Sequence, residues 1–386
     1  MMIGDYMRKI FNKIDKPLLI LTIICLIFGV MMVGSASSLK AYMKKADSYF
    51  YFKRQLLFIG MGLFGALLIL KIPIKKYKRY IWLLVTLVIG ALIYVLVNQK
   101  ISNGVAGWLF IGGFGIQPSE FAKTILILFF AIVFEKMMKI KNLSNVEKVL
   151  PFIVPLIIIF LIFEQPDFGT MMIVVGITAV IFLLIPYDKK TKFVMVTFTV
   201  ISVLVLALTM LVTGKGLSEN QLSRFNFANP CSRYRQKTGY QVCNGYIAIN
   251  SGGILGSGYG NSKQKYLYLP EAYTDFIFAI IIEELGLVVG IILIIIYFAI
   301  IWRILLIGKK SYNLQGTIIC YGAASLIAFH IIINLGGVLG LIPLTGVPLP
   351  FMSYGGSYMI NLIALLALVQ RVNIENRIFE QKHLVR

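Results

Sequence analysis

Long apolar runs separated by short polar segments dominate this sequence. About 20 consecutive apolar residues are enough to cross a lipid bilayer as a helix, and ten runs approach or exceed that length. The fifth run is short, and Gln165 and Pro166 predict an irregular turn at its end. The pattern predicts an all-α polytopic membrane protein with ten transmembrane helices. The runs cover roughly residues 17–37, 55–74, 80–98, 118–135, 150–164, 168–187, 193–213, 275–302, 314–341 and 350–370.

The composition supports this fold class. Of 386 residues, 59% are hydrophobic and 14% are charged, whereas about a quarter of the residues of a soluble domain are charged. The longest polar segment, 214–274, separates the seventh and eighth runs, and a loop of that size is usually functional. No internal repeat is visible, so an inverted-repeat transporter fold gains no support. We expect a single membrane domain over 1–386 with a short polar tail at 371–386.

The net charge of +21 is informative about topology. In a soluble protein it would suggest nucleic-acid binding. Here the positive-inside rule explains it better, because the alternate segments that include the N-terminus hold more Lys and Arg than the others. This predicts cytoplasmic termini, an extracellular 214–274 loop and no nucleic-acid partner.

Three carboxylates lie at the head of the eighth run or inside it, where other runs carry few acids. They are Asp275, Glu283 and Glu284. Ionisable groups at membrane depth are costly and are usually functional. Asp275 lies at the polar–apolar boundary, whereas the two glutamates lie two or more turns deeper. We expect the glutamates to form structural pairs and Asp275 to do chemistry.

Further polar residues lie at predicted outer helix ends, each with two interpretations. Glu120 and Lys123 share one helix face, as a structural ion pair or with Lys123 facing a cavity that holds an anion. Asp167 is either a helix cap or part of an outward-facing cavity. Arg54 is either an interfacial arginine whose side chain snorkels or a phosphate contact.

Two irregular segments also face outward in this topology. Gly253 and Gly256 belong to a glycine-dense stretch that is either a flexible loop or an anion-binding nest of backbone N–H groups. Ser353 and Ser357 follow a proline-rich break, as part of a connector or as substrate-facing hydroxyls. The unusual residues thus converge on one membrane face, which favours a site open to that side over a through-channel.

The remaining candidates are less specific. His330 and Asn334 are one turn apart in the ninth run and are typical of hydrogen bonds between helices. Cys231 and Cys243 lie in the extracellular loop, a compartment that permits a disulfide. A bridge and two free thiols remain open alternatives. A metal site there is disfavoured because the loop has no His.

The order of these motifs resembles the SEDS proteins (FtsW, RodA and SpoVE), the membrane glycosyltransferases of bacterial peptidoglycan synthesis. The resemblance runs nearly end to end and slightly favours FtsW over RodA. This chain departs from the family pattern at Tyr273, where His is common, and at 105–107, where Arg or Lys often occurs. The matching segments are 15–17, 35–37, 117–123, 165–170, 239–241, 247–253, 269–278, 283–286 and 348–357.

The resemblance implies ten transmembrane helices with a large loop between the seventh and eighth. It also implies polymerisation of lipid II, undecaprenyl-pyrophosphoryl disaccharide pentapeptide, on the outer face of the cytoplasmic membrane, in cell division or elongation. The family's essential aspartate corresponds to Asp275. The expected partners are a class B penicillin-binding protein and other divisome or elongasome proteins.

Together these features give a mechanistic hypothesis in which Asp275 is the general base for an acceptor sugar hydroxyl. The leaving undecaprenyl pyrophosphate needs positive charge or backbone donors. A divalent cation, Mg²⁺ or Mn²⁺, could share that role with support from Glu271, although no metal-ligand cluster is visible. The candidate donors are Lys123, Arg54, Arg224, Lys263, Lys265 and the 252–260 loop.

Two other classes of function remain open on the sequence. A lipid II flippase would need polar groups that are reachable from both faces, and here they favour one face. A non-catalytic division scaffold would not need the acid at Asp275. Polymer formation by the purified protein separates the enzyme from both alternatives.

Overall fold

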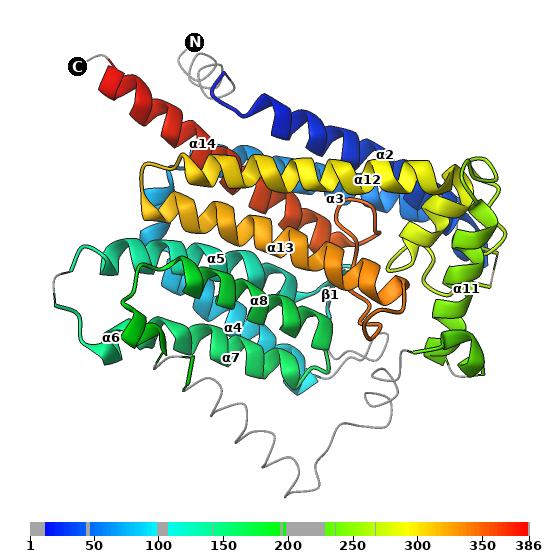
Figure 1. Cartoon of the computed structure of the whole chain (residues 1–386), viewed down its shortest axis with the longest axis horizontal. Helices are drawn as coiled ribbons and strands as arrows, with labels where there is room; N and C mark the ends of the chain where they lie inside the picture. Colours follow the sequence, from blue (N-terminus) through cyan, green and yellow to red (C-terminus); the bar gives the residue numbers. More distant parts are fainter. Residues whose placement is uncertain are drawn as a thin grey trace, which may run out of the picture.

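The structure is a computed structural model. It describes residues 12–43, 47–98, 107–140, 142–193, 196–197, 228–235, 237–266 and 268–384. Within these residues the chain is a bundle of long helices, drawn in Figure 1. The main helices are α2 (Lys16–Met43), α3 (Phe50–Lys71), α4 (Ile81–Asn98), α5 (Pro118–Met137), α7 (Ile153–Phe163), α8 (Phe168–Leu184), α12 (Ile277–Lys309), α13 (Leu314–Val338) and α14 (Gly356–Leu384).

Shorter elements connect these helices. Among them is a two-stranded antiparallel hairpin, which the sequence analysis did not predict. Its turn is formed by Gly112 and Gly113, both with positive φ, as two-residue hairpin turns require. The shorter elements are α6 (Asn145–Val149), α11 (Lys237–Gly252), the 3₁₀ helices Ile74–Arg79, Leu150–Phe152 and Pro230–Arg233, and the strands β1 (Leu109–Ile111) and β2 (Phe114–Ile116).

The chain is a polytopic membrane protein. Seven helical segments of the described residues are long and apolar enough to cross a membrane. Large apolar side chains such as Phe64, Phe298 and Trp82 are well exposed on them, as expected for surfaces that face lipid. The seventh predicted run, 193–213, lies almost wholly outside the described residues.

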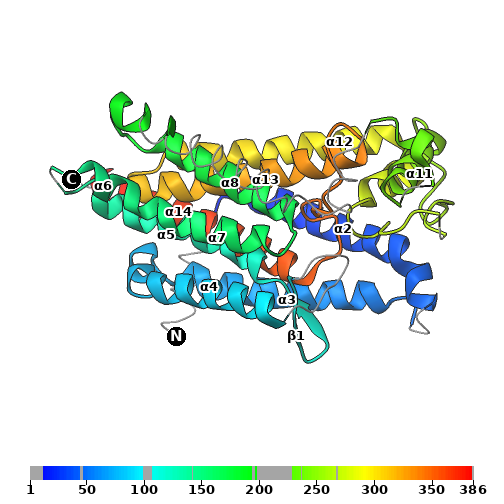
Figure 2. The same ribbon diagram turned by 90° about the horizontal axis from the view of Figure 1, so that it is seen from below.

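The helices form layers around α13 and α14. Helix α13 packs against α5, α8, α12 and α14, and α14 also packs closely on α3. Figure 2 shows α14 running between the α12 and α13 pair and the layer formed by α3 and α4. The two last helices of the chain therefore hold the bundle together.

Helix α14 differs from the predicted tenth run. It begins at Gly356 and continues to Leu384 as one helix, so the polar tail, which was expected to be helical at first, is helical through nearly its whole length. Its polar residues are held by neighbours: Arg371 donates to the Leu70 carbonyl at 2.8 Å, and Asn373 donates to the Lys13 carbonyl at 2.8 Å. These tertiary hydrogen bonds keep the helix in the bundle where its apolar pattern ends.

Candidate active site

Asp275 lies in a turn directly before α12 and keeps part of its surface exposed. Nδ2 of Asn334, on α13, donates to the main-chain oxygens of Asp275 and Val347, both at 2.8 Å. Gly346 has a φ of +74°, and a Cβ there would lie 3.5 Å from Oδ2 of Asp275. The loop after α13 thus approaches the carboxylate with bare backbone, as only glycine readily permits at this φ.

The segment between α13 and α14 is fastened to the Asp275 turn by further hydrogen bonds. The buried Ser353 hydroxyl donates to the Thr274 carbonyl at 2.6 Å and accepts from the Leu349 N–H at 2.8 Å. The Tyr354 N–H donates to the Tyr273 carbonyl at 2.9 Å. Ser353 therefore shapes the site from inside the protein, and its role as a substrate-facing hydroxyl stays a prediction.

Burial raises the pKa of Asp275 to about 6. The hydrogen bond from Thr274 and the ammonium of Lys40 act in the opposite direction, whereas the charge of Glu271 adds to the increase. Lys40 and Glu271 form a salt bridge of 3.0 Å beside the turn. A carboxyl group that ionises near neutral pH is well suited to accept a proton.

Glu120 and Lys123 are buried at the start of α5. Nζ of Lys123 lies 2.8 Å from Oε1 of Glu120 and 3.0 Å from Nε2 of His330. Nδ1 of His330 lies 3.1 Å from the Pro348 carbonyl, which can only accept, so we assign the ring proton to Nδ1 and the acceptor role to Nε2. This geometry matches the ion-pair interpretation, and ligand binding by Lys123 stays a prediction.

The N-terminal ends of α5, α8 and α14 are linked through Gln117. Its side chain donates to Oδ2 of Asp167 at 2.9 Å, and its main-chain N–H donates to Oγ of Ser357 at 2.9 Å. Asp167 also caps α8 by accepting from the Thr170 N–H at 3.0 Å. Asp167 and Ser357 thus have structural partners, whereas their contact with substrate stays a prediction.

Arg54 lies at the beginning of α3, beside the hairpin. Its Nη2 donates to the Gly113 carbonyl at 2.6 Å. The guanidinium carbon lies 4.9 Å from the ring centres of both Phe50 and Phe114. Such aromatic contacts hold the planar guanidinium at the same end of the bundle as Asp275.

Glu284 is a buried carboxylate with several hydrogen-bond partners near the site. It accepts from the Ser35 hydroxyl at 2.7 Å, from the Gly260 N–H at 3.0 Å and from Nζ of Lys265 at 2.8 Å. Lys265 also donates to Ser35 Oγ and to the Gly260 carbonyl. A lysine has three N–H donors, so all of them are used here. This leaves Lys265 without a donor for a pyrophosphate in this conformation.

Glu283 is satisfied by a second set of groups. It accepts from the Ser262 hydroxyl, from the Lys263 N–H at 2.9 Å and from the Gln264 N–H at 3.2 Å. The Lys263 side chain itself is exposed and lies in the same segment before α12. The two glutamates have the structural pairing that their depth in the apolar run indicated.

The glycine-dense loop packs against a break in α12. Gly286 has non-helical angles, with φ 84° and ψ 167°. The Leu287 N–H donates to the Gly253 carbonyl at 3.0 Å, and a Cβ on Gly256 would lie 2.4 Å from the Glu284 carbonyl. The loop therefore supplies hydrogen bonds that the interrupted helix lacks. An additional anion-binding role for Gly253 or Gly256 stays a prediction.

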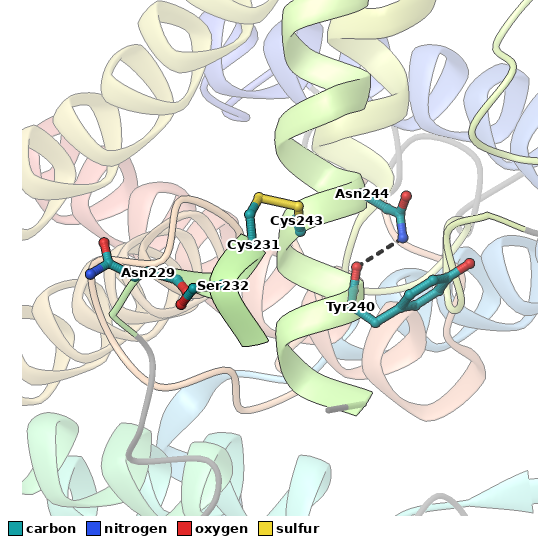
Figure 3. Close-up of a disulfide and its surroundings, with 6 residues drawn as sticks. All are labelled: Asn229, Cys231, Ser232, Tyr240, Cys243 and Asn244. Atoms are coloured by element: carbon teal, nitrogen blue, oxygen red, sulfur yellow. Dashed lines mark hydrogen bonds between the residues drawn. A yellow bond between two sulfur atoms is a disulfide. The ribbon is translucent and has the colours of Figure 1, made fainter. Parts of the chain in front are cut away.

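The remaining candidates have different outcomes. Cys231 and Cys243 are joined by a disulfide that ties the 3₁₀ helix Pro230–Arg233 to α11 (Figure 3). Arg224 lies outside the described residues. No group of three His, Cys, Asp or Glu side chains that could hold a metal ion occurs among the described residues. Since the carboxylate of Glu271 is paired with Lys40, a role for it in binding a cation stays a prediction.

Sequence reasoning missed the connections that complete the Asp275 turn. Asn334 was expected to make hydrogen bonds between helices, but not to hold the main chain of Asp275. Lys40 was not singled out, although its ammonium lies 5.0 Å from the ring centre of Tyr273 and pairs with Glu271. These contacts join residues that are far apart in the chain, and no local pattern indicates them.

Comparison with known proteins places the chain among similar sequences over almost its whole length. A family model for FtsW, RodA and SpoVE, described as cell cycle protein, matches residues 16–378. A probable peptidoglycan glycosyltransferase FtsW of Bacillus subtilis is 36% identical, covering 97% of this chain and 94% of the relative. Stage V sporulation protein E of the same organism is 34% identical, covering 94% and 98%.

Solved structures share the fold. One of them is described as structural coordination of polymerization and crosslinking by a peptidoglycan synthase complex. It matches with a TM-score of 0.74 at 24% identity, covering 94% of this chain and 98% of that chain. The rod shape determining protein RodA of Thermus thermophilus matches with a TM-score of 0.65 at 24% identity, covering 93% and 96%. The arrangement of helices is therefore the one seen in these proteins.

Proposed function

This chain belongs to the FtsW/RodA/SpoVE family of cell cycle proteins, and we propose that it is a peptidoglycan glycosyltransferase that polymerises lipid II. The single observation that carries the proposal is Asp275. It is a partly exposed carboxyl with a pKa raised to about 6, held in a turn at the end of the bundle. Relatives named as probable peptidoglycan glycosyltransferases match nearly the full chain.

The proposed topology has ten transmembrane helices, with both termini in the cytoplasm. The 214–274 loop and the Asp275 turn then face outward from the cytoplasmic membrane. The excess of Lys and Arg in the opposite segments supports this orientation. It places the active site where lipid II would present its disaccharide, at the outer boundary.

In the proposed reaction, Asp275 accepts the proton of the 4-hydroxyl of an acceptor GlcNAc. The oxygen attacks the anomeric carbon of the donor MurNAc, and a glycosidic bond forms as the bond to the pyrophosphate oxygen breaks. Undecaprenyl pyrophosphate leaves with the bonding electrons. A base with a pKa of about 6 is largely ionised at neutral pH and can therefore accept the proton.

The leaving pyrophosphate carries negative charge, which nearby cations would stabilise. Lys263 is exposed, and Lys40 and Arg54 are partly exposed at this end of the bundle. Lys123 and Lys265 are buried and paired, so they would support the site from behind unless their pairs open. A divalent cation near Glu271 would supply the same kind of stabilisation.

The proposed partner is a class B penicillin-binding protein, which would cross-link the new glycan strand. A similar solved structure supports this assignment, because it is described as structural coordination of polymerization and crosslinking by a peptidoglycan synthase complex. Similarity to the FtsW proteins supports a role in cell division over one in elongation. Localisation of a tagged copy to midcell or to the side wall distinguishes the two.

The experiment uses the purified full chain with its partner transpeptidase and labelled lipid II. Wild-type protein should form glycan polymer, and Asp275→Asn should form it at least about 100-fold more slowly. Asp47→Asn serves as the control because Asp47 is an exposed aspartate paired with Lys53. Transport of lipid II across proteoliposomes without polymer would instead identify a flippase, and polymerisation by Asp275→Asn at the wild-type rate would refute the base assignment.

A further inference from the structure

A polar recess lies at the end of the bundle opposite Asp275. Its volume is about 640 Å³, and it is formed by the segment before α2 and the last turns of α12 and α14. In Figure 1 the last turns of α14 lie at this end. The stretch of α12 from Ile277 to Arg303 rises roughly 40 Å, which exceeds the ~30 Å of a hydrocarbon core. Asp275 and the recess therefore lie at opposite membrane boundaries.

The floor of the recess is fixed by hydrogen bonds. Arg303 donates to the buried carboxylate of Asp15 at 2.5 Å. The main-chain N–H and C=O of Asp15 bond the side chain of Gln370 at 2.8 and 3.0 Å, and Asn373 donates to the Lys13 carbonyl at 2.8 Å. Three chain segments thus meet in one fixed geometry, as a preorganised binding site requires.

The charge of the recess is positive. Arg303 neutralises Asp15. Within the described residues, no salt bridge engages the other three basic residues of the lining, Lys13, Lys310 and Arg377. Opposing them are the carboxylate of Glu380 and the terminal carbonyls of α12, which carry a partial negative charge. Three cationic side chains outweigh these groups, so the recess favours an anion.

The position of the recess relative to the membrane indicates which anion it binds. Trp302, next to Arg303, is 63% exposed, and tryptophan is enriched at the headgroup level of membranes. Basic pockets between transmembrane helices bind anionic lipid headgroups. We propose that this recess binds the phosphate of an anionic phospholipid, with Lys13, Lys310 and Arg377 as its ligands. Free phosphate offers the same chemistry, but only a lipid is concentrated at this depth.

This site is separate from the proposed transferase reaction and makes a distinct prediction about neighbouring lysines. Lys310 lines the recess, whereas Lys309, the residue before it, does not. Both side chains are exposed, so each can be neutralised with little effect on folding. The pair therefore separates a specific site from general attraction between basic residues and an anionic membrane.

The test measures retention of phosphatidylglycerol by the full-length protein released from nanodiscs of phosphatidylglycerol and phosphatidylcholine, with native mass spectrometry as the readout. Lys310→Gln should weaken retention about fivefold, since one Lys or Arg near an anionic surface contributes about 1 kcal/mol. Lys310→Gln with Arg377→Gln should weaken it further. Lys309→Gln should leave it unchanged, and thermal unfolding of each variant verifies that it is folded.

Two results would overturn the proposal. Equal losses for Lys309→Gln and Lys310→Gln would show that general surface charge attracts the lipid. Protection of the protein against thermal unfolding by inorganic phosphate alone, to the same extent as by phosphatidylglycerol, would show that the recess is a phosphate site without lipid preference. Selective loss in Lys310→Gln together with no effect of inorganic phosphate supports a lipid headgroup site.

Discussion

Asp275 and Glu284 are carboxylates of one chain segment, just before α12 and inside it, yet their surroundings differ in kind. Glu284 accepts hydrogen bonds from a serine, a lysine and a main-chain N–H. No salt bridge to Asp275 occurs among the described residues, and burial raises its pKa. The Asp275 carboxyl has a hydrogen bond from Thr274, and Asn334 holds its main chain. A buried acid with full pairing supports the fold, whereas one without a salt bridge remains available for chemistry.

The comparison is tested most strongly by removing each carboxylate in turn. Asp275→Asn should lower the rate of glycan polymerisation by about 100- to 10,000-fold, the usual contribution of a general base. Its thermal stability at pH 8 should not fall, because a group whose folded pKa is raised destabilises the fold once it is ionised. Glu284→Gln should show a clear loss of stability. Equal stability losses in the two variants would contradict the distinction.

Removing Lys265, the cation that pairs with Glu284, should give the next largest effect, which is a loss of stability. Lys265→Met leaves a buried carboxylate without its cation, which typically costs about 3–5 kcal/mol. The double variant Lys265→Met with Glu284→Gln should be more stable than Lys265→Met alone. The stability of both variants in detergent can be measured by thermal unfolding or by resistance to protease.

Lys263→Met provides the control for this pair, because the Lys263 side chain is exposed and only its main-chain N–H bonds Glu283. A stability loss in Lys263→Met as large as that in Lys265→Met would mean that the ion pair is not the cause.

The support of the Asp275 main chain should have a smaller effect that is specific to catalysis. Asn334→Leu removes two hydrogen bonds of 2.8 Å, each with a net contribution of about 1 kcal/mol. We expect kcat to fall about tenfold with little change in KM. Ser325→Ala on the same helix removes only hydrogen bonds within α13 and should leave kcat unchanged. A change in KM with no change in kcat would argue against a role of Asn334 in positioning Asp275.

The smallest predicted effect is on pH dependence. The acid limb of kcat/KM should have an apparent pKa near 6, with activity lost as the pH falls through that value and Asp275 becomes protonated. Glu271→Gln should move the limb to lower pH and Lys40→Met to higher pH, each by up to about one unit. Lys53→Met, which affects an exposed pair with Asp47, should not move it.

Much of the fold was predictable, because run length and composition reflect the bilayer directly. The long apolar helices of the described chain lie where the apolar runs indicated, but α12 and α14 extend well past the predicted ends, and α11 lies within the predicted 214–274 loop. The extension of α14 past residue 370 depends on hydrogen bonds from Arg371 and Asn373 to distant segments. The break of α12 at Gly286 depends on the loop at 253–258 that packs on it.

The site was predictable only in part. Asp275 could be found because an acid at a membrane boundary is costly, and the motif around it is distinctive. Its supporting groups were not predictable, since Asn334 and Ser353 reach the turn from residues 59 and 79 positions away in the chain. The same is true of Lys265, whose buried pair with Glu284 forms only when the segment between α11 and α12 packs on α12. Spacing along the chain contains no signal for these contacts.

The order in which the residues of these contacts are synthesised has a consequence for assembly of the protein in the membrane. The partners of Glu284, namely Ser35, Gly260 and Lys265, all precede it in the chain, so the glutamate can be paired as soon as it leaves the ribosome. Of the groups that hold the Asp275 turn, Asn334 lies on α13 and Ser353 lies in the segment between α13 and α14. A nascent chain can therefore bury its structural acids early, but the proposed active site is completed only when α13 and the segment after it have been inserted.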